Sequence, residues 1–235
     1  MSTNDYRRSA TSYALRGISG TDAVAFRALS ERFSDSKLSG RALDLGCGSG
    51  RSTRFLKALN FETVGVDVSE AMVIEARKHD PGGEYHVYPA QGQIPFGDSY
   101  FDVILSTWVL LELSSKASLG GLLGEAARVL ATGGRGFFVT NTADFYRHRW
   151  VSCEVDFPEN EAPLHSGQTV KARLVPEGVM VTDVFWSDDD YREVLAAAKL
   201  RVAHAWHPKA PASDARWLDE TRVAPYVIYE VEKTW

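Results

Sequence analysis

Cysteine is scarce in this sequence, which has only Cys47 and Cys153 among its 235 residues. Two cysteines are too few for a disulfide framework, and they are too far apart for the Cys-x-x-Cys pair of a zinc site. The histidines stand in unrelated contexts, without the spacing of metal ligands on one helix face. We therefore expect a chain of a reducing compartment, the cytoplasm, that uses no catalytic metal.

Long apolar runs and clusters of positive charge are also missing. No stretch approaches the ~20 apolar residues that a membrane span needs, and residues 1–16 lack the apolar centre of a secretory signal. The formal net charge is −5, and the lysines and arginines do not gather in one run. Because binding to a nucleic-acid backbone requires clustered positive charge, we expect neither a nucleic acid nor a membrane as a partner.

What the sequence does have is an ordinary globular composition, with 44% hydrophobic and 24% charged residues. This composition and length predict one domain over residues 1–235. We expect the chain to be a monomer or a homodimer. Apolar strands alternate with amphipathic helices as far as residue 141. The expected strands are 41–45, 62–67, 84–88, 100–106 and 135–141. The expected helices are 21–33, 52–59, 70–78 and 119–130. The alternation predicts an α/β fold with a mostly parallel sheet and right-handed crossovers.

The last third of the chain has a different pattern. Residues 169–175 and 179–186 are typical of a hairpin, and a helix is expected from 188 to 199 behind the N-cap Ser187. Strands at 201–207 and 225–232 are expected to form an antiparallel edge of the sheet. We divide the chain into an N-terminal cap segment, a cofactor-binding core, a lid or substrate insertion, and a C-terminal helix with edge strands. Their bounds are 1–35, 41–141, 142–186 and 187–235.

A glycine-rich loop, Asp44-Leu-Gly-Cys-Gly-Ser-Gly50, joins the first of these strands to the helix that follows. Glycines allow positive φ and let a ligand approach the backbone closely. The spacing differs from the dinucleotide motif G-x-G-x-x-G, in which a third glycine would stand at Arg51, and no Gly-Lys-Ser/Thr follows as in a P-loop. Asp67, at the end of the second strand, is suited to accept hydrogen bonds from two ribose hydroxyls. Together these features indicate a site for a nucleotide-like ligand.

Five segments in order resemble the successive motifs of the class I methyltransferases. They are residues 42–50, 64–69, 94–96, 101–104 and 127–130. The resemblance implies a Rossmann-like sheet of seven strands with a reversed last strand. It also implies S-adenosylmethionine as cofactor, S-adenosylhomocysteine as product, and no metal.

The resemblance further implies a set of residues around the cofactor. Methionine-side positions would come from the glycine loop, the end of the fourth strand and the N-terminal segment, and adenine-side positions from the regions after Asp67 and before residue 95. The set is Tyr13, Arg16, Asp44, Gly46, Cys47, Gly48, Gly50, Asp67, Val68, Met72, Gln91, Gly92, Ile94, Ser106 and Thr107. One departure concerns Ala90, because the family often has an aspartate there that accepts from the adenine amino group.

Candidates for chemistry follow the fourth and fifth strands, where open α/β sheets bind ligands. Glu112, Tyr146 and His148 are candidate catalytic or orienting groups, although each could instead serve packing or face solvent. The candidate substrate contacts are aromatic or polar, namely Trp108, Asn141, Phe145, Trp186 and Tyr191. We expect methyl transfer to a small-molecule acceptor, with nitrogen or oxygen favoured over carbon. The alternatives are a cofactor-binding protein that does not methylate, and a nicotinamide-dependent reductase, which the absence of a Tyr-x-x-x-Lys pair disfavours.

Overall fold

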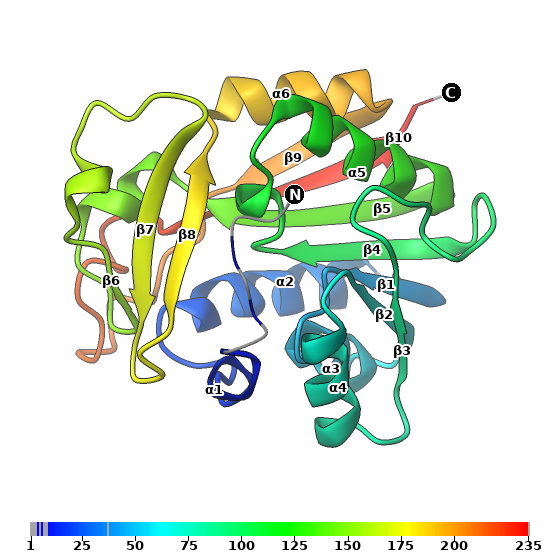
Figure 1. The fold of residues 1–235 in the computed structure, drawn as a ribbon, viewed down its shortest axis with the longest axis horizontal. Helices are drawn as coiled ribbons and strands as arrows, with labels where there is room; N and C mark the ends of the chain where they lie inside the picture. The colour runs from blue at the N-terminus through cyan, green and yellow to red at the C-terminus, as the bar shows by residue number, and fades with distance from the viewer. Residues whose placement is uncertain (1–3, 5, 7–8, 37, 235) are drawn as a thin grey trace.

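The computed structural model describes residues 4, 6, 9–36 and 38–234, and its centre is a sheet of seven strands (Figure 1). The strand order is β3-β2-β1-β4-β5-β10-β9. The five parallel strands on one side of this order are β1 (Arg41–Leu45), β2 (Glu62–Asp67), β3 (Glu84–Val87), β4 (Phe101–Thr107) and β5 (Leu130–Asn141). The two remaining strands are β9 (Leu200–Trp206) and β10 (Tyr226–Lys233). The expected Rossmann-like fold class is confirmed.

Helices cover both faces of the sheet. On one face lie α5 (Lys116–Val129) and α6 (Asp188–Ala197), and on the other lie α2 (Asp22–Ser36) and α3 (Arg51–Ala58) (Figure 1). Each face has its own apolar cluster, and β4 contributes side chains to both clusters. This two-sided burial explains why β4 reads as a nearly continuous apolar run.

Serine caps begin several of these helices. Ser69 accepts a hydrogen bond from the amide of Met72 at the start of α4 (Glu70–His79), and Ser115 does the same for α5. Ser187 and Asp190 form a reciprocal capping box at the start of α6. Such caps satisfy amides that have no partner inside the helix.

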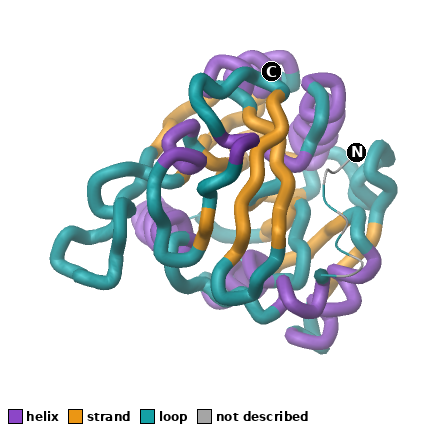
Figure 2. Tube along the Cα trace, turned by 60° about the vertical axis from the view of Figure 1, so that its left-hand side comes forward, coloured by secondary structure: helices purple, strands orange, loops and turns teal. Residues whose placement is uncertain are grey.

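A second sheet of three antiparallel strands packs beside the main one. It consists of β6 (Cys153–Glu154), β7 (Gln168–Leu174) and β8 (Met180–Phe185). Figure 2 shows the long β7–β8 hairpin side by side with the loops that surround it. Both strands of the hairpin lie where the sequence predicted them, within a residue or so at their ends.

Several details differ from the sequence predictions. The expected strand at 135–141 begins earlier, at Leu130, because α5 ends at Val129 and the chain continues extended past Gly133, which has a φ of +81°. The last two strands do form an antiparallel pair at the edge of the sheet, as expected, with β10 between β5 and β9 and antiparallel to both. The short helix α1 (Ala10–Ala14) and strand β6 were not predicted. In the described part of the chain, no helix is long and apolar enough to cross a membrane.

Candidate active site

A cleft of about 520 Å³ opens over the carboxyl ends of β1, β2 and β4. This is the edge at which open α/β sheets bind ligands. The glycine loop and the end of β2 form one side of the cleft. Helices α4 and α5, the segments after β3 and β4, and the N-terminal segment also line it. Nine of the predicted site residues line it, namely Tyr13, Gly46, Gly48, Asp67, Val68, Met72, Thr107, Trp108 and Glu112.

The three glycines of the loop have positive φ, but for different reasons. Gly46 has a φ of +77°, and a Cβ there would overlap with Cγ2 of Val109. Gly48 has a φ of +51° and faces the cleft, where a Cβ would come 3.2 Å from Cε of Met72. Gly50 has a φ of +79°, begins α3, and would meet the Tyr85 hydroxyl at 2.7 Å. Gly46 and Gly48 therefore leave room along the cleft, whereas Gly50 serves the turn into the helix.

Asp67 ties the glycine loop to the end of β2. One carboxylate oxygen accepts a hydrogen bond from the amide of Gly48 at 2.8 Å, and the other accepts from the amide of Ser69 at 2.8 Å. Burial raises the pKa of the Asp67 carboxyl, although these amide bonds oppose the change. Because each oxygen still has a lone pair, the carboxylate that shapes the loop also presents acceptors to the cleft.

Asp44, Cys47 and Ser106 lie beneath the loop and do not line the cleft. Oδ2 of Asp44 accepts from the hydroxyls of Ser52 at 2.8 Å and Thr53 at 2.6 Å. Burial raises the pKa of Asp44 to about 6 against the effect of these two bonds. Ser106 donates to the carbonyl of Leu45 at 2.9 Å. Their positions support the loop from below instead of contacting a ligand directly.

The adenine side of the cleft differs from the prediction. Tyr88 and Ala90 line the cleft, whereas Gln91, Gly92 and Ile94 do not. Ile94 is buried in the core and its amide donates to Glu125 at 2.8 Å. The useful signal for Tyr88 was its place directly after β3, at the same edge as Asp67.

A small inner chamber of about 50 Å³ adjoins the cleft. Tyr6, Tyr13, Trp108 and Glu112 line both spaces and separate them. The Tyr6 hydroxyl donates a short hydrogen bond to Oε1 of Glu112. On its far side the chamber is lined by Asn141, Phe145, Asp183 and Tyr226, among others. The β7–β8 hairpin thus contributes to the wall, as the position of Asp183 on β8 illustrates.

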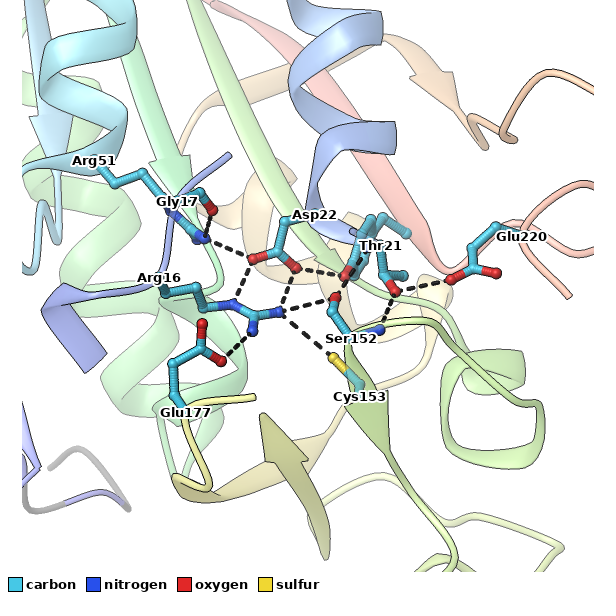
Figure 3. A network of polar contacts seen from close by, with 10 residues as sticks. Arg16, Gly17, Thr21, Asp22, Arg51, Ser152, Cys153, Glu177 and Glu220 are labelled. Atoms are coloured by element: carbon cyan, nitrogen blue, oxygen red, sulfur yellow. Dashed lines mark hydrogen bonds and ion pairs between the residues drawn. The ribbon is translucent and has the colours of Figure 1, made fainter. Parts of the chain in front are cut away.

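Arg16, predicted beside the cofactor, instead belongs to a buried ionic network that borders the chamber (Figure 3). It donates to both oxygens of Asp22, at 2.7 and 3.0 Å, and to Glu177 at 3.0 Å. Arg51 contacts the same Asp22 at 2.6 Å. Burial alone would raise the pKa of Asp22, but the two guanidinium groups outweigh it and lower that pKa to about 2. The local sequence could not reveal Glu177, which lies 161 residues along the chain from Arg16.

Four predicted chemistry or substrate residues lie outside both cavities. Tyr146 is buried behind the chamber, where its hydroxyl donates to Asp183 at 3.2 Å. His148 lies in a separate surface groove, 3.7 Å from Asp219. Trp186 donates to the carbonyl of Leu113 at 3.1 Å, and the hydroxyls of Tyr191 and Thr140 are 3.0 Å apart in the core. The side chains of Trp186 and Tyr191 pack in the apolar core.

Comparison with known proteins gives a consistent result. Residues 43–138 match the family described as methyltransferase domain. The demethylmenaquinone methyltransferase of Tropheryma whipplei (strain Twist) is 36% identical over 94 residues, which are 40% of this chain and 38% of that protein. The malonyl-[acyl-carrier protein] O-methyltransferase of Enterobacter lignolyticus is 31% identical over 123 residues, or 52% and 45% of the two chains. The match thus spans less than half the length of these relatives.

Solved structures share the fold over nearly the whole chain. An S-adenosylmethionine-dependent methyltransferase from Clostridium acetobutylicum has a TM-score of 0.65 and 14% identity, and the match covers 91% of this chain and 92% of that one. A second, from Mesorhizobium loti, has a TM-score of 0.63 and 17% identity, with 91% and 98% covered. At such identities the likeness concerns the fold.

Proposed function

We propose that this chain, whose central domain is that of the class I methyltransferases, transfers a methyl group from S-adenosylmethionine to a small molecule. One observation carries the proposal: the cleft beside the glycine loop and Asp67 adjoins a small chamber with aromatic and charged walls. Two reactants therefore have separate sites that meet at Trp108 and Glu112. We expect a nitrogen or oxygen nucleophile before a carbon one.

The residues of the cleft fit an adenosine-containing cofactor. Gly48 leaves a cradle that a Cβ would narrow, and Asp67 presents a carboxylate beside it, suited to ribose hydroxyls. Val68 and Met72 offer apolar surface for a ring next to that carboxylate. Asp44, Cys47, Gly50 and Ser106 would act indirectly, by holding the loop in shape.

When bound, S-adenosylmethionine supplies an electrophilic methyl group on a sulfonium. The contribution of the chain is then to position the acceptor, to exclude water, and to remove a proton where the nucleophile carries one. Glu112 is placed for the last task, because its carboxylate lies between cleft and chamber. Tyr6 orients this carboxylate through its hydroxyl. Trp108 and Phe145 would confine the acceptor, since both side chains line the chamber.

Calorimetric titration with S-adenosylmethionine, combined with the release of S-adenosylhomocysteine over a panel of small acceptors, tests this function. We expect Asp67→Ala to weaken cofactor binding at least tenfold, about 1.4 kcal/mol, because the ribose contact and the anchoring of the loop are both lost. The matched control is Asp98→Ala, which removes a carboxylate with 79% side-chain exposure away from the cleft.

Each alternative has its own result. Binding of NADH in place of S-adenosylmethionine would indicate the nicotinamide-dependent reductase. Tight cofactor binding without product release for every acceptor would indicate a protein that binds the cofactor but does not methylate. An unchanged dissociation constant in Asp67→Ala would contradict the ribose assignment.

A further inference from the structure

Asp183 is a buried carboxylate that the sequence analysis did not single out. It lies on β8, is 2% exposed, and lines the inner chamber. The Tyr146 hydroxyl donates to its Oδ2 at 3.2 Å. Among residues 4, 6, 9–36 and 38–234, no lysine, arginine or histidine forms an ion pair with it. A buried carboxylate without a cationic partner is costly, so its presence on the wall of a cavity calls for an explanation.

A second carboxylate, Glu112, lines the same chamber from the turn after β4, which packs against β8. The two carboxylates interact electrostatically. Burial raises the pKa of Asp183 well above its usual range, and the negative charge of Glu112 raises it further. A cation next to Asp183 would lower the cost of burying that carboxylate.

The two arginines of the chamber wall, Arg16 and Arg51, already have anionic partners. Arg16 lies between Asp22 and Glu177, and Arg51 also contacts Asp22, so that two cations face two anions. Figure 3 shows this closed set of contacts. Both guanidinium groups are therefore already paired with carboxylates, and neither is left unpaired to bind an anionic acceptor.

Asn141 provides an independent indication of a ligand. Its side chain is buried and lines the chamber, and its amide nitrogen donates to the Tyr146 hydroxyl at 3.0 Å. Its amide oxygen is buried and has no hydrogen-bond partner in the described part of the chain. Because buried polar atoms almost always have partners, this oxygen marks a place for a missing donor.

Aromatic rings complete the wall. Phe145 stacks on Tyr226 with ring centroids 5.8 Å apart, and both rings line the chamber together with Tyr13. Aromatic faces attract cations, and they also pack well against the alkyl groups that an amine carries. Carboxylates, an unused carbonyl oxygen and aromatic faces form a set that matches an ammonium group, which has three donors and no acceptor.

We propose that the inner chamber selects a primary or secondary amine as methyl acceptor, with Asp183, Glu112 and the Asn141 amide oxygen holding its ammonium head group. This inference rests on the proposed function. The ammonium first gives one proton to a chamber carboxylate. The nitrogen lone pair then forms the new C–N bond as the C–S bond breaks, and that electron pair goes to sulfur. The products are the methylated ammonium, S-adenosylhomocysteine and a protonated carboxyl, so charge and atoms balance.

Three probes of nearly equal size test this selection: propylamine, 1-propanol and propionate, titrated against the protein saturated with S-adenosylhomocysteine. We expect the wild-type chain to bind propylamine at least tenfold more tightly than either of the others. Asp183→Asn should weaken the binding of propylamine at least tenfold, because the amide keeps the shape of the side chain and loses its charge. The affinity for 1-propanol should stay within twofold of the wild-type value. The matched control is Asp35→Asn, the same change at an exposed position of α2, which should behave as wild type.

The wild-type comparison needs no variant, so it remains decisive even if Asp183→Asn folds poorly. Equal or tighter binding of 1-propanol or propionate, or no binding of propylamine at its highest soluble concentration, overturns the inference. So does unchanged propylamine binding in a folded Asp183→Asn chain. Methyl transfer to phenols or carboxylates but not to amines would overturn the amine class alone. No product release with any acceptor would instead overturn the proposed function.

Discussion

Two buried aspartates, Asp22 and Asp44, illustrate how neighbours decide the behaviour of one residue type. Asp22 accepts from Arg16, Arg51 and the Tyr226 hydroxyl, and its pKa falls to about 2 despite burial. Asp44 has only hydroxyl partners, and burial raises its pKa to about 6. Positive charge next to Asp22 outweighs desolvation, whereas two neutral donors at Asp44 do not.

The raised pKa of Asp44 makes a pH prediction. Between its unfolded pKa near 4 and its folded pKa of about 6, the folded state holds more protons, so Asp44 destabilises the fold as pH rises. The substitution Asp44→Asn removes this pH-dependent destabilisation, because the amide does not titrate. We expect the free energy of unfolding of the variant, relative to wild type, to be about 2 kcal/mol higher at pH 8 than at pH 4, which means a more stable variant at pH 8. Urea unfolding at both pH values measures it, and a constant difference would contradict it.

Glu112 and His148 were both predicted as catalytic candidates, and the structure places them differently. Glu112 lies between cleft and chamber, whereas His148 lies in another groove. We expect Glu112→Gln to lower kcat at least about tenfold with cofactor affinity unchanged, because the amide cannot accept a proton. His148→Ala serves as the comparison and should turn over at the wild-type rate. Equal rates in Glu112→Gln and wild type would remove Glu112 from the mechanism.

Elements whose signals are local were predictable. The strand–glycine loop–helix unit at residues 41–58 lies where the sequence indicated, because turn chemistry and apolar periodicity are encoded within a few residues. The chamber was not predictable in this way. No local pattern distinguishes Asp183 from the many other polar residues of the chain. Only the packing of β8 against the rest of the fold brings it to Glu112. Gln91 was assigned from motif position alone, and the chain turns it away from the cleft.

The glycine loop offers a test with an internal match. Gly46 and Gly133 both have positive φ, +77° and +81°, so an alanine at either pays about 1 kcal/mol of backbone strain. At Gly133 a Cβ would meet nothing within 4 Å, whereas at Gly46 it would overlap with Val109. We expect Gly46→Ala to lower the affinity for S-adenosylmethionine at least tenfold. We also expect its melting temperature to be lower than that of Gly133→Ala. Equal melting temperatures and cofactor affinities in the two variants would contradict the close packing of this loop.

At the scale of the whole molecule, the network around Arg16 connects parts that are distant in sequence. It joins the N-terminal segment to α2 through Asp22, to β6 through Cys153, and to the turn of the β7–β8 hairpin through Glu177 (Figure 3). The proposed division of the chain into cap, core, lid and C-terminal parts remains a prediction, but this network would couple the cap to the lid.

Breaking that network should destabilise the entire fold. We expect Arg16→Met to lower the free energy of unfolding by about 3 kcal/mol, because Asp22 and Glu177 would stay buried with fewer cations. Arg216→Met is the matched control, since Arg216 pairs with Asp214 at the surface with 82% of its side chain exposed. Chemical denaturation measures both variants. Losses of the same size would show that burial of the Arg16 network contributes nothing specific.

The position of β10 has a consequence for synthesis on the ribosome. The strand is made after all its neighbours, yet it lies between β5 and β9 and bonds to both. While it is still inside the exit tunnel, β5 has an open flank and β9 has no place in the main sheet. Tyr226, a wall of the chamber, arrives with the same strand. The nascent chain can therefore assemble the cleft first, and the wall of the chamber is completed only after β10 has left the exit tunnel.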